Sequence, residues 1–404
     1  MALSPEQLAS MPDYIVSMYA DLEEFIIQDI ASRIGKTGTI TATAEQQIET
    51  LQGLGLNKKE IEEKIAEVLK KSSKEVEQLF DEAASTSMNA ENKIYEKAGM
   101  QTFDIKNDEI LQDYIKAAAL QTKKEFKNIT RSLGFATKKN GKIVYSDIAK
   151  FYQETVDFAN MQVVTGATTR EQAVKRAVKR MTDSGLRYVD YENGYSMNVQ
   201  DAINRTVRTS ANQMCNKLTN HMMNKNIAKE DQYAEVSAHA GARPSHQTWQ
   251  GQVYKVEGST SEYDNLYEAT ELGSAGGLCG ANCRHSYYPF IPDISVRAYS
   301  ESDLEKYNSN EAKSYNGKEY TQYEASQRQR VIERSIRQTK REILGYQSAG
   351  LEDDMKNSQI LLQQQRKEYK KFCNEMGLQL ESNRTQQYGF GRSEAQKARY
   401  IKEK

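Results

Sequence analysis

The feature that most constrains this chain is one window, residues 237–292, which gathers its rarest residue types. The window holds three of the four His, the single Trp, two of the four Cys and three of the five Pro. Gly, Pro and small polar residues set backbone turns, whereas His and Cys bind metals or carry out acid–base chemistry. The residues on both sides of the window show helical periodicity. We therefore predict a compact, irregular module held between helical arms.

The module itself reads as α+β. Alternating side chains at 233–237 predict one strand, and residues 252–256, between Gly251 and Gly258, predict a second. A glycine-rich loop follows at 273–280. We assign Trp249 to the structural core, because so small a sheet otherwise has little to bury. Gly251, which precedes the second strand, is assigned to the core with it.

The fold class predicted for the whole chain is mainly α, with this small α+β module inserted. The expected regions are an acidic helical region at 1–100, a helical middle region at 101–232, the module at 233–295, and a helical hairpin with a loosely ordered tail at 296–404. Caps and spacing predict three short helices between residues 40 and 85, and antiparallel helices at 321–344 and 351–377. The last ~20 residues are expected to be loosely ordered.

Composition excludes several classes of protein. The chain has 404 residues, 38% of them hydrophobic, and a formal net charge of −1, which argues against coating nucleic acid by bulk electrostatics. Residues 1–100 carry 18 acidic and 10 basic side chains, so the chain is acidic first and basic later. Four Cys in this length do not form a secreted disulfide framework, and neither a signal peptide nor a membrane span is evident. We expect a soluble protein made in a reducing cytoplasm.

Two phrases in the window carry a family resemblance: SAHAGARPSHQTWQGQVY at 237–254 and GLCGANCRHSYYPFIP at 277–292. Together they resemble the tailed-phage minor capsid proteins of the minor capsid protein 2 group, whose core is similar to the Mu-F-like head morphogenesis module. The residues that match the module are His246, Trp249 and Gly251 in the first phrase and Asn282, Cys283 and Arg284 in the second. His285 stands where the module usually has its last Cys.

The resemblance implies a structural component of the virion. The protein would lie inside the head near the portal, after assembly in the host cytoplasm, without contact with a membrane. Its implied partners are the portal and the major capsid or scaffolding proteins, with packaged DNA as a further candidate.

Five side chains of the window offer the nitrogen and sulfur donors that zinc prefers. They are Cys279, Cys283, His285, His246 and His239. Four of them could close a tetrahedral structural zinc site, with His246 the favoured fourth ligand and His239 its substitute. Gly276, Gly277 and Gly280 would let the backbone bend round the ion. In the alternative interpretation, the His side chains hydrogen-bond loop carbonyls and the Cys side chains are simply buried.

A metal-dependent nuclease, or another enzyme that acts on DNA through the His/Cys cluster, is the alternative function. Such a site requires carboxylate partners, and none is suitably placed near Asn282. No GxSxG elbow, Walker loop or HExxH motif occurs. We therefore predict that the protein is not an enzyme, and we nominate no catalytic or organic cofactor-binding residue.

The expected helix at 321–344 contains a basic run with a net charge of +5 between residues 328 and 341. As a solvated face, such a run needs no partner. As an interaction surface, it could meet DNA phosphates or an acidic protein surface. The candidate polyanion-binding residues are Arg328, Arg330, Arg334, Arg337, Lys340 and Arg341.

Overall fold

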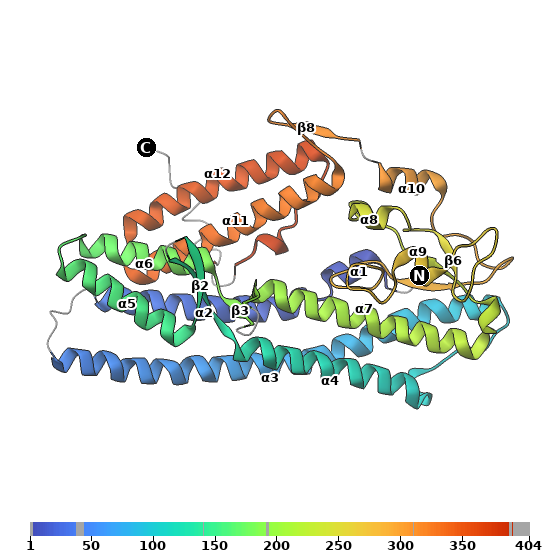
Figure 1. Ribbon diagram of the computed structural model, residues 1–404, viewed down its shortest axis with the longest axis horizontal. Coiled ribbons are helices and arrows are strands. Elements are labelled where there is room, and N and C mark those ends of the chain that lie inside the picture. The colour runs from blue at the N-terminus through green and yellow to red at the C-terminus, as the bar shows by residue number, and fades with distance from the viewer. Residues whose placement is uncertain are drawn as a thin grey trace. The chain divides into compact units, whose positions relative to one another are not determined.

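The structure is a computed structural model, which describes residues 3–37, 44–139, 141–190, 194–309, 311–387 and 390. At 37, 44–58, 139, 160 and 164 it describes the backbone alone. Helices dominate and the strands are short and antiparallel, so the predicted mainly α class with a small α+β module is confirmed (Figure 1). Most of the predicted C-terminal tail lies outside the described residues.

The contacts of the chain group it into two compact units, each assembled from three segments. Unit 1 comprises Met1–Ile15, Ser72–Phe126 and Ile203–Ser326, and unit 2 comprises Val16–Lys71, Lys127–Ala202 and Gln327–Lys404. The four consecutive regions predicted from the sequence rest on charge and periodicity. This grouping by contacts does not test them, and they stay a prediction.

Unit 1 is built on long helices and a small sheet. Its helices are α1 (Pro5–Ser10), the later part of α3 (Ala44–Lys97), most of α4 (Glu109–Arg131) and of α7 (Val199–Asn226), α8 (Pro244–Gln247), α9 (Leu266–Thr270) and α10 (Glu301–Asn308). Short 3-10 helices cover Ile105–Asn107 and Lys229–Asp231. Its strands are β5 (Tyr233–Val236), β6 (Val253–Lys255), β7 (Tyr287–Phe290), β8 (Lys313–Tyr315) and β9 (Lys318–Tyr320).

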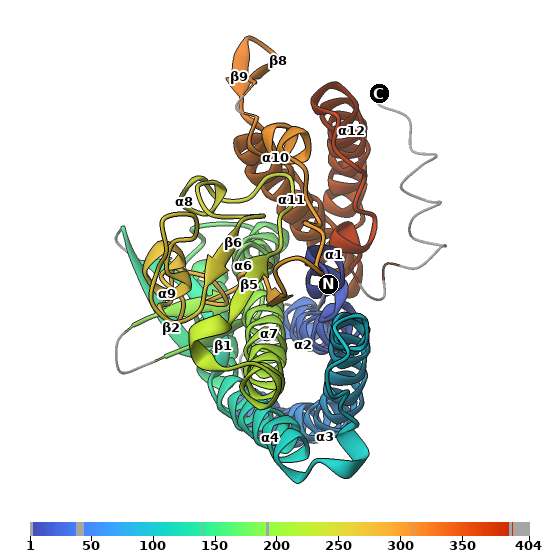
Figure 2. The same cartoon turned by 90° about the vertical axis from the view of Figure 1, so that its right-hand side faces the viewer.

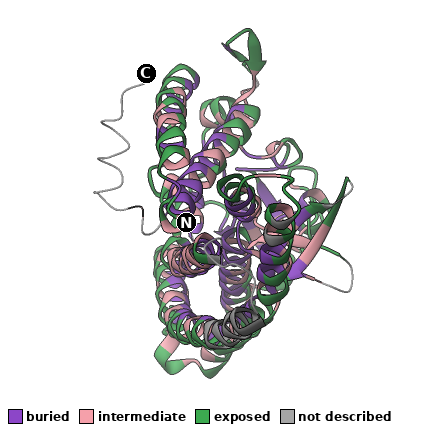
Figure 3. Ribbon diagram, turned by 90° about the vertical axis from the view of Figure 1, so that its left-hand side faces the viewer, coloured by how far each residue is buried: buried purple, intermediate pink, exposed green. Residues whose placement is uncertain are grey.

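The long helices of unit 1 pack through stripes of buried residues three or four positions apart, which is the spacing of one helix face. In α3 the stripe includes Val76, Phe80 and Tyr95, and in α4 it includes Leu111 and Phe126. Figure 3 shows the resulting pattern, in which buried and exposed residues follow opposite sides of the helices.

The structure corrects the prediction of three short helices between 40 and 85, because α3 runs without a break from Ala44 to Lys97. Gly53 and Gly55 lie inside it, although a glycine costs about 1 kcal/mol in a helix interior. In the part whose side chains are described, the buried positions Ile61, Val68 and Val76 continue one apolar face. Packing of that face therefore outweighs the local signals for a helix end.

The sheet of the module has the strand order β6-β5-β7, and all its pairs are antiparallel. Both predicted strands are confirmed, as β5 and β6, which lie side by side in Figure 2. The second phrase of the window supplies β7, which pairs Val236 with Tyr287. β8 and β9 form a separate hairpin.

Unit 2 combines helices with a four-stranded antiparallel sheet of order β2-β1-β3-β4. Its helices are α2 (Asp13–Thr37), the first part of α3, α5 (Ile148–Val164), α6 (Arg170–Ser184), α11 (Gln322–Ala349) and α12 (Glu352–Met376), with a 3-10 helix at Asn383–Thr385. Its strands are β1 (Leu133–Lys139), β2 (Lys142–Asp147), β3 (Arg187–Val189) and β4 (Ser196–Asn198). Phe135 of β1 contacts Phe151 of α5, with ring centroids 4.6 Å apart.

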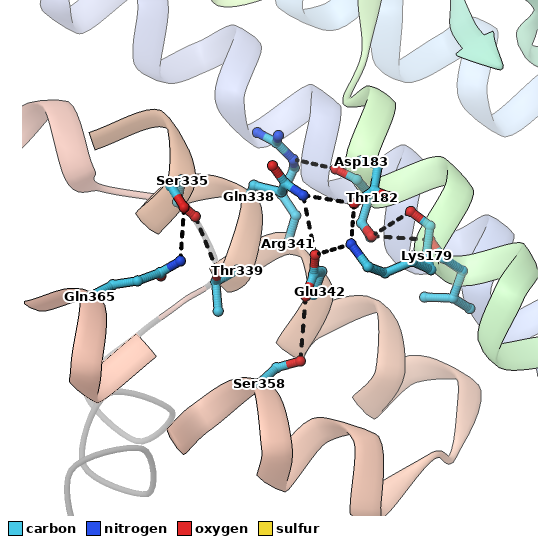
Figure 4. A network of polar contacts seen from close by, with 11 residues as sticks. Lys179, Thr182, Asp183, Ser335, Gln338, Thr339, Arg341, Glu342, Ser358 and Gln365 are labelled. Atoms are coloured by element: carbon cyan, nitrogen blue, oxygen red, sulfur yellow. Dashed lines mark hydrogen bonds and ion pairs between the residues drawn. The ribbon is translucent and has the colours of Figure 1, made fainter. Parts of the chain in front are cut away.

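The predicted C-terminal hairpin is confirmed as α11 and α12, which are joined at Gly350 with φ +75°. Polar contacts tie the hairpin to α6 (Figure 4). Lys179 of α6 donates to Glu342 of α11 over 2.8 Å, and Ser358 of α12 lies 3.5 Å from the other oxygen of Glu342. Gln338 donates to Asp183 of α6 over 2.7 Å.

Among the described residues, no helix combines the length and the apolar character needed to span a membrane.

Candidate metal centre

Strand pairing in unit 1 brings the two phrases of the window together. Beyond the paired ends of β5 and β7, Ser237 N–H donates to the Ser286 carbonyl over 2.8 Å, and Ser286 N–H donates to the Ser237 hydroxyl over 2.9 Å. These bonds place the segment before β7 beside the start of the first phrase. His285 lies just before β7.

α8 presents the second histidine. Pro244 is the first residue of this helix, where its missing N–H costs no hydrogen bond, and His246 lies in the same turn. His246 is buried and its ring centroid lies 4.4 Å from that of Trp249. This short helix lies at the surface of the module, where Pro244 and Ser245 are exposed, and places the imidazole of His246 in the interior.

Three potential metal ligands meet there: His246, Cys283 and His285, whose donor atoms all lie within 4.8 Å of one another. The Nδ1 atoms of His246 and His285 are 3.3 Å apart. Cys283 Sγ lies 3.6 Å from Nδ1 of His285 and 4.0 Å from Nδ1 of His246. The exposed fractions of the three residues are 1–2%. The structure therefore holds a buried His/Cys/His cluster that could bind a metal ion.

The outer nitrogens of both imidazoles have oxygen partners. His246 Nε2 lies 2.8 Å from the carbonyl oxygen of Gly276, and His285 Nε2 lies 3.0 Å from Oε1 of Gln250. Hydrogen bonds of this kind orient the imidazole ligands of metals in proteins.

A polar stripe on α7 holds the loop that carries the cysteines. Asn212 donates to the carbonyl of His285 over 2.8 Å, and Asn216 donates to Cys279 Sγ over 2.8 Å. One turn earlier, the buried Arg208 donates to Asn282 Oδ1 and, over 2.8 Å, to the carbonyl of Leu8. Asn212, Asn216 and Arg208 recur every four residues and so share one helix face.

The loop that carries the cysteines uses its glycines for close backbone packing, and two of its non-glycine residues have a positive φ. Cys279 and Asn282, each with φ 59°, adopt the left-handed conformation. A Cβ at Gly277 would lie 2.1 Å from the carbonyl oxygen of Glu271, and one at Gly280 would lie 2.5 Å from that of Ser274. These two glycines are therefore required by close backbone packing.

Burial disfavours the charged forms of the titratable groups of the cluster, as the directions of their pKa shifts indicate. Burial lowers the pKa of His246, and burial followed by the charge of His239 lowers the pKa of His285 well below its usual range. Burial also raises the pKa of the Cys283 thiol. Neutral imidazole is the form that binds metal ions.

The two other predicted ligands lie outside this group of three. His239 stacks on His285 with ring centroids 4.5 Å apart, but its Nδ1 lies 3.0 Å from the Ala240 carbonyl and 3.2 Å from Nη2 of Arg284. Cys279 Sγ accepts the hydrogen bond from Asn216. The structure thus brings together three of the five predicted donors.

Trp249 and Gly251, assigned to the core from the sequence, are both packed inside the module. Trp249 is 5% exposed and belongs to an apolar cluster. The other buried members of that cluster are Ala234, Val236, Tyr254, Leu266, Leu278, Cys279 and Tyr287. Gly251 has φ +69°, and a Cβ there would lie 2.3 Å from Cδ2 of Leu304.

The six basic residues predicted as a polyanion surface do not share one exposed face of α11. Arg328 and Arg334 are exposed, whereas Lys340 and Arg341 are buried. Arg337 and Lys340 donate to the carbonyls of Arg384 and Thr385, and Arg341 Nη1 lies 3.6 Å from Glu23 Oε2. Burial lowers the pKa of Arg330. Several members of the set therefore stabilise unit 2 internally.

Sequence reasoning missed the residues that support the cluster. Gln250 is adjacent to Trp249 in the first phrase, but its role depends on the fold, and Asn212 and Asn216 lie about seventy positions before the loop. His221, the one His outside the window, has a side chain only 10% exposed, and its Nε2 lies 3.2 Å from Oδ2 of Asp108. The available signal was the run of small polar residues on one face of α7.

The comparison with protein families covers most of the chain. A family model described as phage minor capsid protein 2 matches residues 3–374. No curated protein and no solved structure shows a significant match. Because the match includes both units and the His/Cys/His cluster, the chain belongs to the phage minor capsid protein 2 family.

Proposed function

We propose that this protein is a structural component of the phage head that acts in head morphogenesis and lies inside the head near the portal. The observation that carries the proposal is the family match across residues 3–374, because membership of a capsid family implies a place in the virion. Assembly in the host cytoplasm, before the genome is packaged, belongs to the same proposal.

The proposed partners are the portal and the major capsid or scaffolding proteins. Long helices with exposed polar faces can present extended surfaces to such subunits. Packaged DNA is a further proposed partner, and Arg328 and Arg334 are the exposed members of the basic set that could contact its phosphates.

The proposed role is structural rather than enzymatic. The His/Cys/His cluster contains no carboxylate, and its three residues are only 1–2% exposed. A DNA phosphate could not reach the cluster in this structure. The nuclease hypothesis therefore gains no support from the geometry.

We propose further that the cluster holds a structural zinc ion. The donor set of two imidazoles and one thiolate suits zinc better than magnesium or calcium, which prefer oxygen ligands. Bound there, the ion would fasten α8 to the loop before β7. The Mu-F-like character of residues 233–295 remains a prediction on which this proposal does not depend.

The test compares heads made by phage with an intact gene and by phage carrying a nonsense mutation in it, with a suppressor host as the control. Quantitative mass spectrometry of purified heads should find the protein at low copy number, and the nonsense phage should yield fewer or malformed heads. Absence from purified heads, together with normal heads in the mutant, would refute the structural role.

A further inference from the structure

We infer that unit 1 binds one zinc ion through three protein atoms: Nδ1 of His246, Nδ1 of His285 and Sγ of Cys283. This inference rests on the proposal of a structural zinc and deepens it, because it names the ligand atoms and limits the protein ligands to three. It also assigns supporting roles to Gln250 and to the carbonyl of Gly276.

The distances between the three donor atoms suit a tetrahedral zinc ion. A tetrahedral zinc ion with Zn–N near 2.05 Å and Zn–S near 2.3 Å requires ligand separations of about 3.3 Å for N···N and about 3.6 Å for N···S. The observed separations are 3.3 Å between the two Nδ1 atoms and 3.6 and 4.0 Å from these atoms to Cys283 Sγ. Two of the three donor separations match these values. The third, between Cys283 Sγ and His246 Nδ1, would match after a shift of a few tenths of an ångström in one side chain.

The hydrogen bond of His246 determines its tautomer. Its Nε2 lies 2.8 Å from a backbone carbonyl, that of Gly276, and a carbonyl oxygen can only accept. The proton of the neutral ring must therefore be on Nε2. Nδ1 is left with a bare lone pair that faces into the cluster.

The contact with Gln250 determines the tautomer of His285 in the same way. Oε1 of Gln250 accepts the backbone N–H of His239 over 3.0 Å, and Nε2 of Gln250 donates to Asn308 over 2.6 Å, so the amide cannot be flipped. His285 Nε2 lies 3.0 Å from this accepting oxygen and must carry the proton. Nδ1 of His285 is then also a bare lone pair.

The lone pairs of the two Nδ1 atoms, those of His246 and His285, therefore face each other 3.3 Å apart in a buried site. Within the cluster, the Cys283 thiol is the one donor among the described residues, and it has a single proton to donate. Two acceptors without a donor between them are costly when buried. A zinc ion satisfies both at once, and Cys283 releases its proton to solvent as the thiolate binds. Among the described residues, the hydrogen-bonded alternative leaves at least one of the two Nδ1 atoms without a donor.

Neither remaining candidate is needed as a ligand. The Nδ1 of His239 contacts Ala240 and Arg284, and Cys279 Sγ accepts from Asn216. The fourth position would then be filled by a small ligand such as water. The ion is nevertheless structural, because its protein ligands are buried and offer a substrate no access.

The test begins with full-length protein purified without a tag. Elemental analysis should find about one zinc per chain, and X-ray absorption at the zinc edge should resolve one sulfur at about 2.3 Å and nitrogen or oxygen at about 2.0–2.1 Å. Less than half a zinc per chain after growth with added zinc, or a first shell without sulfur or with two sulfurs, would overturn the inference. These measurements use wild-type protein and so do not depend on the folding of a variant.

Variants then identify the ligands. Cys283→Ser and His246→Ala should lose most of the bound zinc, whereas the matched controls Cys373→Ser and His221→Ala should keep it. Cys279→Ser and His239→Ala should keep it too, and zinc loss in Cys279→Ser would contradict a three-ligand site. Circular dichroism of every variant shows whether the helices are intact.

Metal content is measured on isolated protein, so its outcome is separate from that of the head experiment. Zinc in a protein absent from heads would leave the site standing and remove the virion role. A protein that is present in heads and free of zinc would leave the virion role standing and remove the zinc site.

Discussion

Trp249 links the apolar core of unit 1 to the His/Cys/His cluster. It belongs to the buried cluster that includes Val236 and Tyr287, and its ring centroid lies 4.4 Å from that of His246 and 4.9 Å from that of His285. The hydroxyl of Tyr254 donates to its carbonyl over 3.0 Å. Because it is the only Trp in the chain, its fluorescence reports on unit 1 alone.

We predict that Trp249→Ala destabilises the protein by about 3–5 kcal/mol, the usual cost of truncating a buried aromatic side chain. Trp249→Phe is the control, because it keeps a ring and should cost less. Thermal unfolding followed by circular dichroism measures both. An unfolding curve for Trp249→Ala that overlays the wild type would show that Trp249 is not a core residue.

Glu91 is a carboxyl group buried among the helices of unit 1. Its Oε1 accepts from Thr219 over 2.6 Å and from Ser87 over 3.3 Å, and Oε2 has no hydrogen-bond partner among the described residues. Burial raises its pKa to about 8 from its ordinary 4.5. The titratable groups that interact with it include Tyr95 and Cys215.

This raised pKa predicts a pH dependence of stability. Between pH 4.5 and about 8 the folded protein keeps a proton on Glu91 that the unfolded chain has lost, so stability contributed by this group falls as pH rises through that window. Glu91→Gln removes the effect. Relative to wild type, the variant should gain stability from pH 5 to pH 8.5, on the order of a few kcal/mol.

Denaturant unfolding at several pH values measures the difference between Glu91→Gln and wild type. Glu82→Gln, on the exposed side of the same helix, is the control and should run parallel to wild type. A difference between Glu91→Gln and wild type that stays constant with pH would contradict the buried, protonated carboxyl.

At the scale of elements, α10 packs closely on the turn that carries Gly251. A Cβ on Gly251 would lie 2.3 Å from Cδ2 of Leu304 in α10 and 3.1 Å from Cβ of Ala238. Gly258, with φ +75°, shares the left-handed backbone but has nothing within 4 Å of such a Cβ. Substitution of Gly258 therefore tests backbone strain alone, whereas substitution of Gly251 tests backbone strain together with crowding.

We predict that Gly251→Ala and Gly258→Ala both lose about 1–2 kcal/mol to backbone strain. Gly251→Ala should lose a further ~1 kcal/mol or more through overpacking. Thermal unfolding measures the difference in stability loss between the two variants. Adding Leu304→Ala to Gly251→Ala should remove the crowding and so reduce the extra loss caused by Gly251→Ala. Equal losses in the two single variants would mean that α10 does not press on this turn.

Local signals in the sequence were enough for the elements with clear boundaries. Residues 233–237 and 252–256 predicted β5 and β6, and caps and helical spacing at 321–344 and 351–377 predicted the hairpin of α11 and α12. The unbroken α3 could not be predicted in this way, because buried side chains along one face decide its length.

The cluster was predictable in composition and not in geometry. Rare residue types in one window pointed to His246, Cys283 and His285. Cys279 Sγ instead accepts a hydrogen bond from Asn216, which lies 63 positions earlier in the chain. The orientation of Gln250 depends on the backbone of His239 and on Asn308. Contacts between such distant positions leave no local pattern.

At the scale of the whole molecule, each unit combines segments from distant parts of the chain. The family match extends across both units, from residue 3 to residue 374. The function proposed here therefore rests on both units, whereas the proposed zinc site lies within unit 1 alone.

Cross-linking mass spectrometry of purified heads can decide whether this protein is built into the phage head beside the portal, as we propose. Lysines of this chain should form cross-links with the portal subunit at a frequency well above that of links to the major capsid protein. Cross-links confined to the major capsid protein, or heads that lack this chain, would contradict the claim.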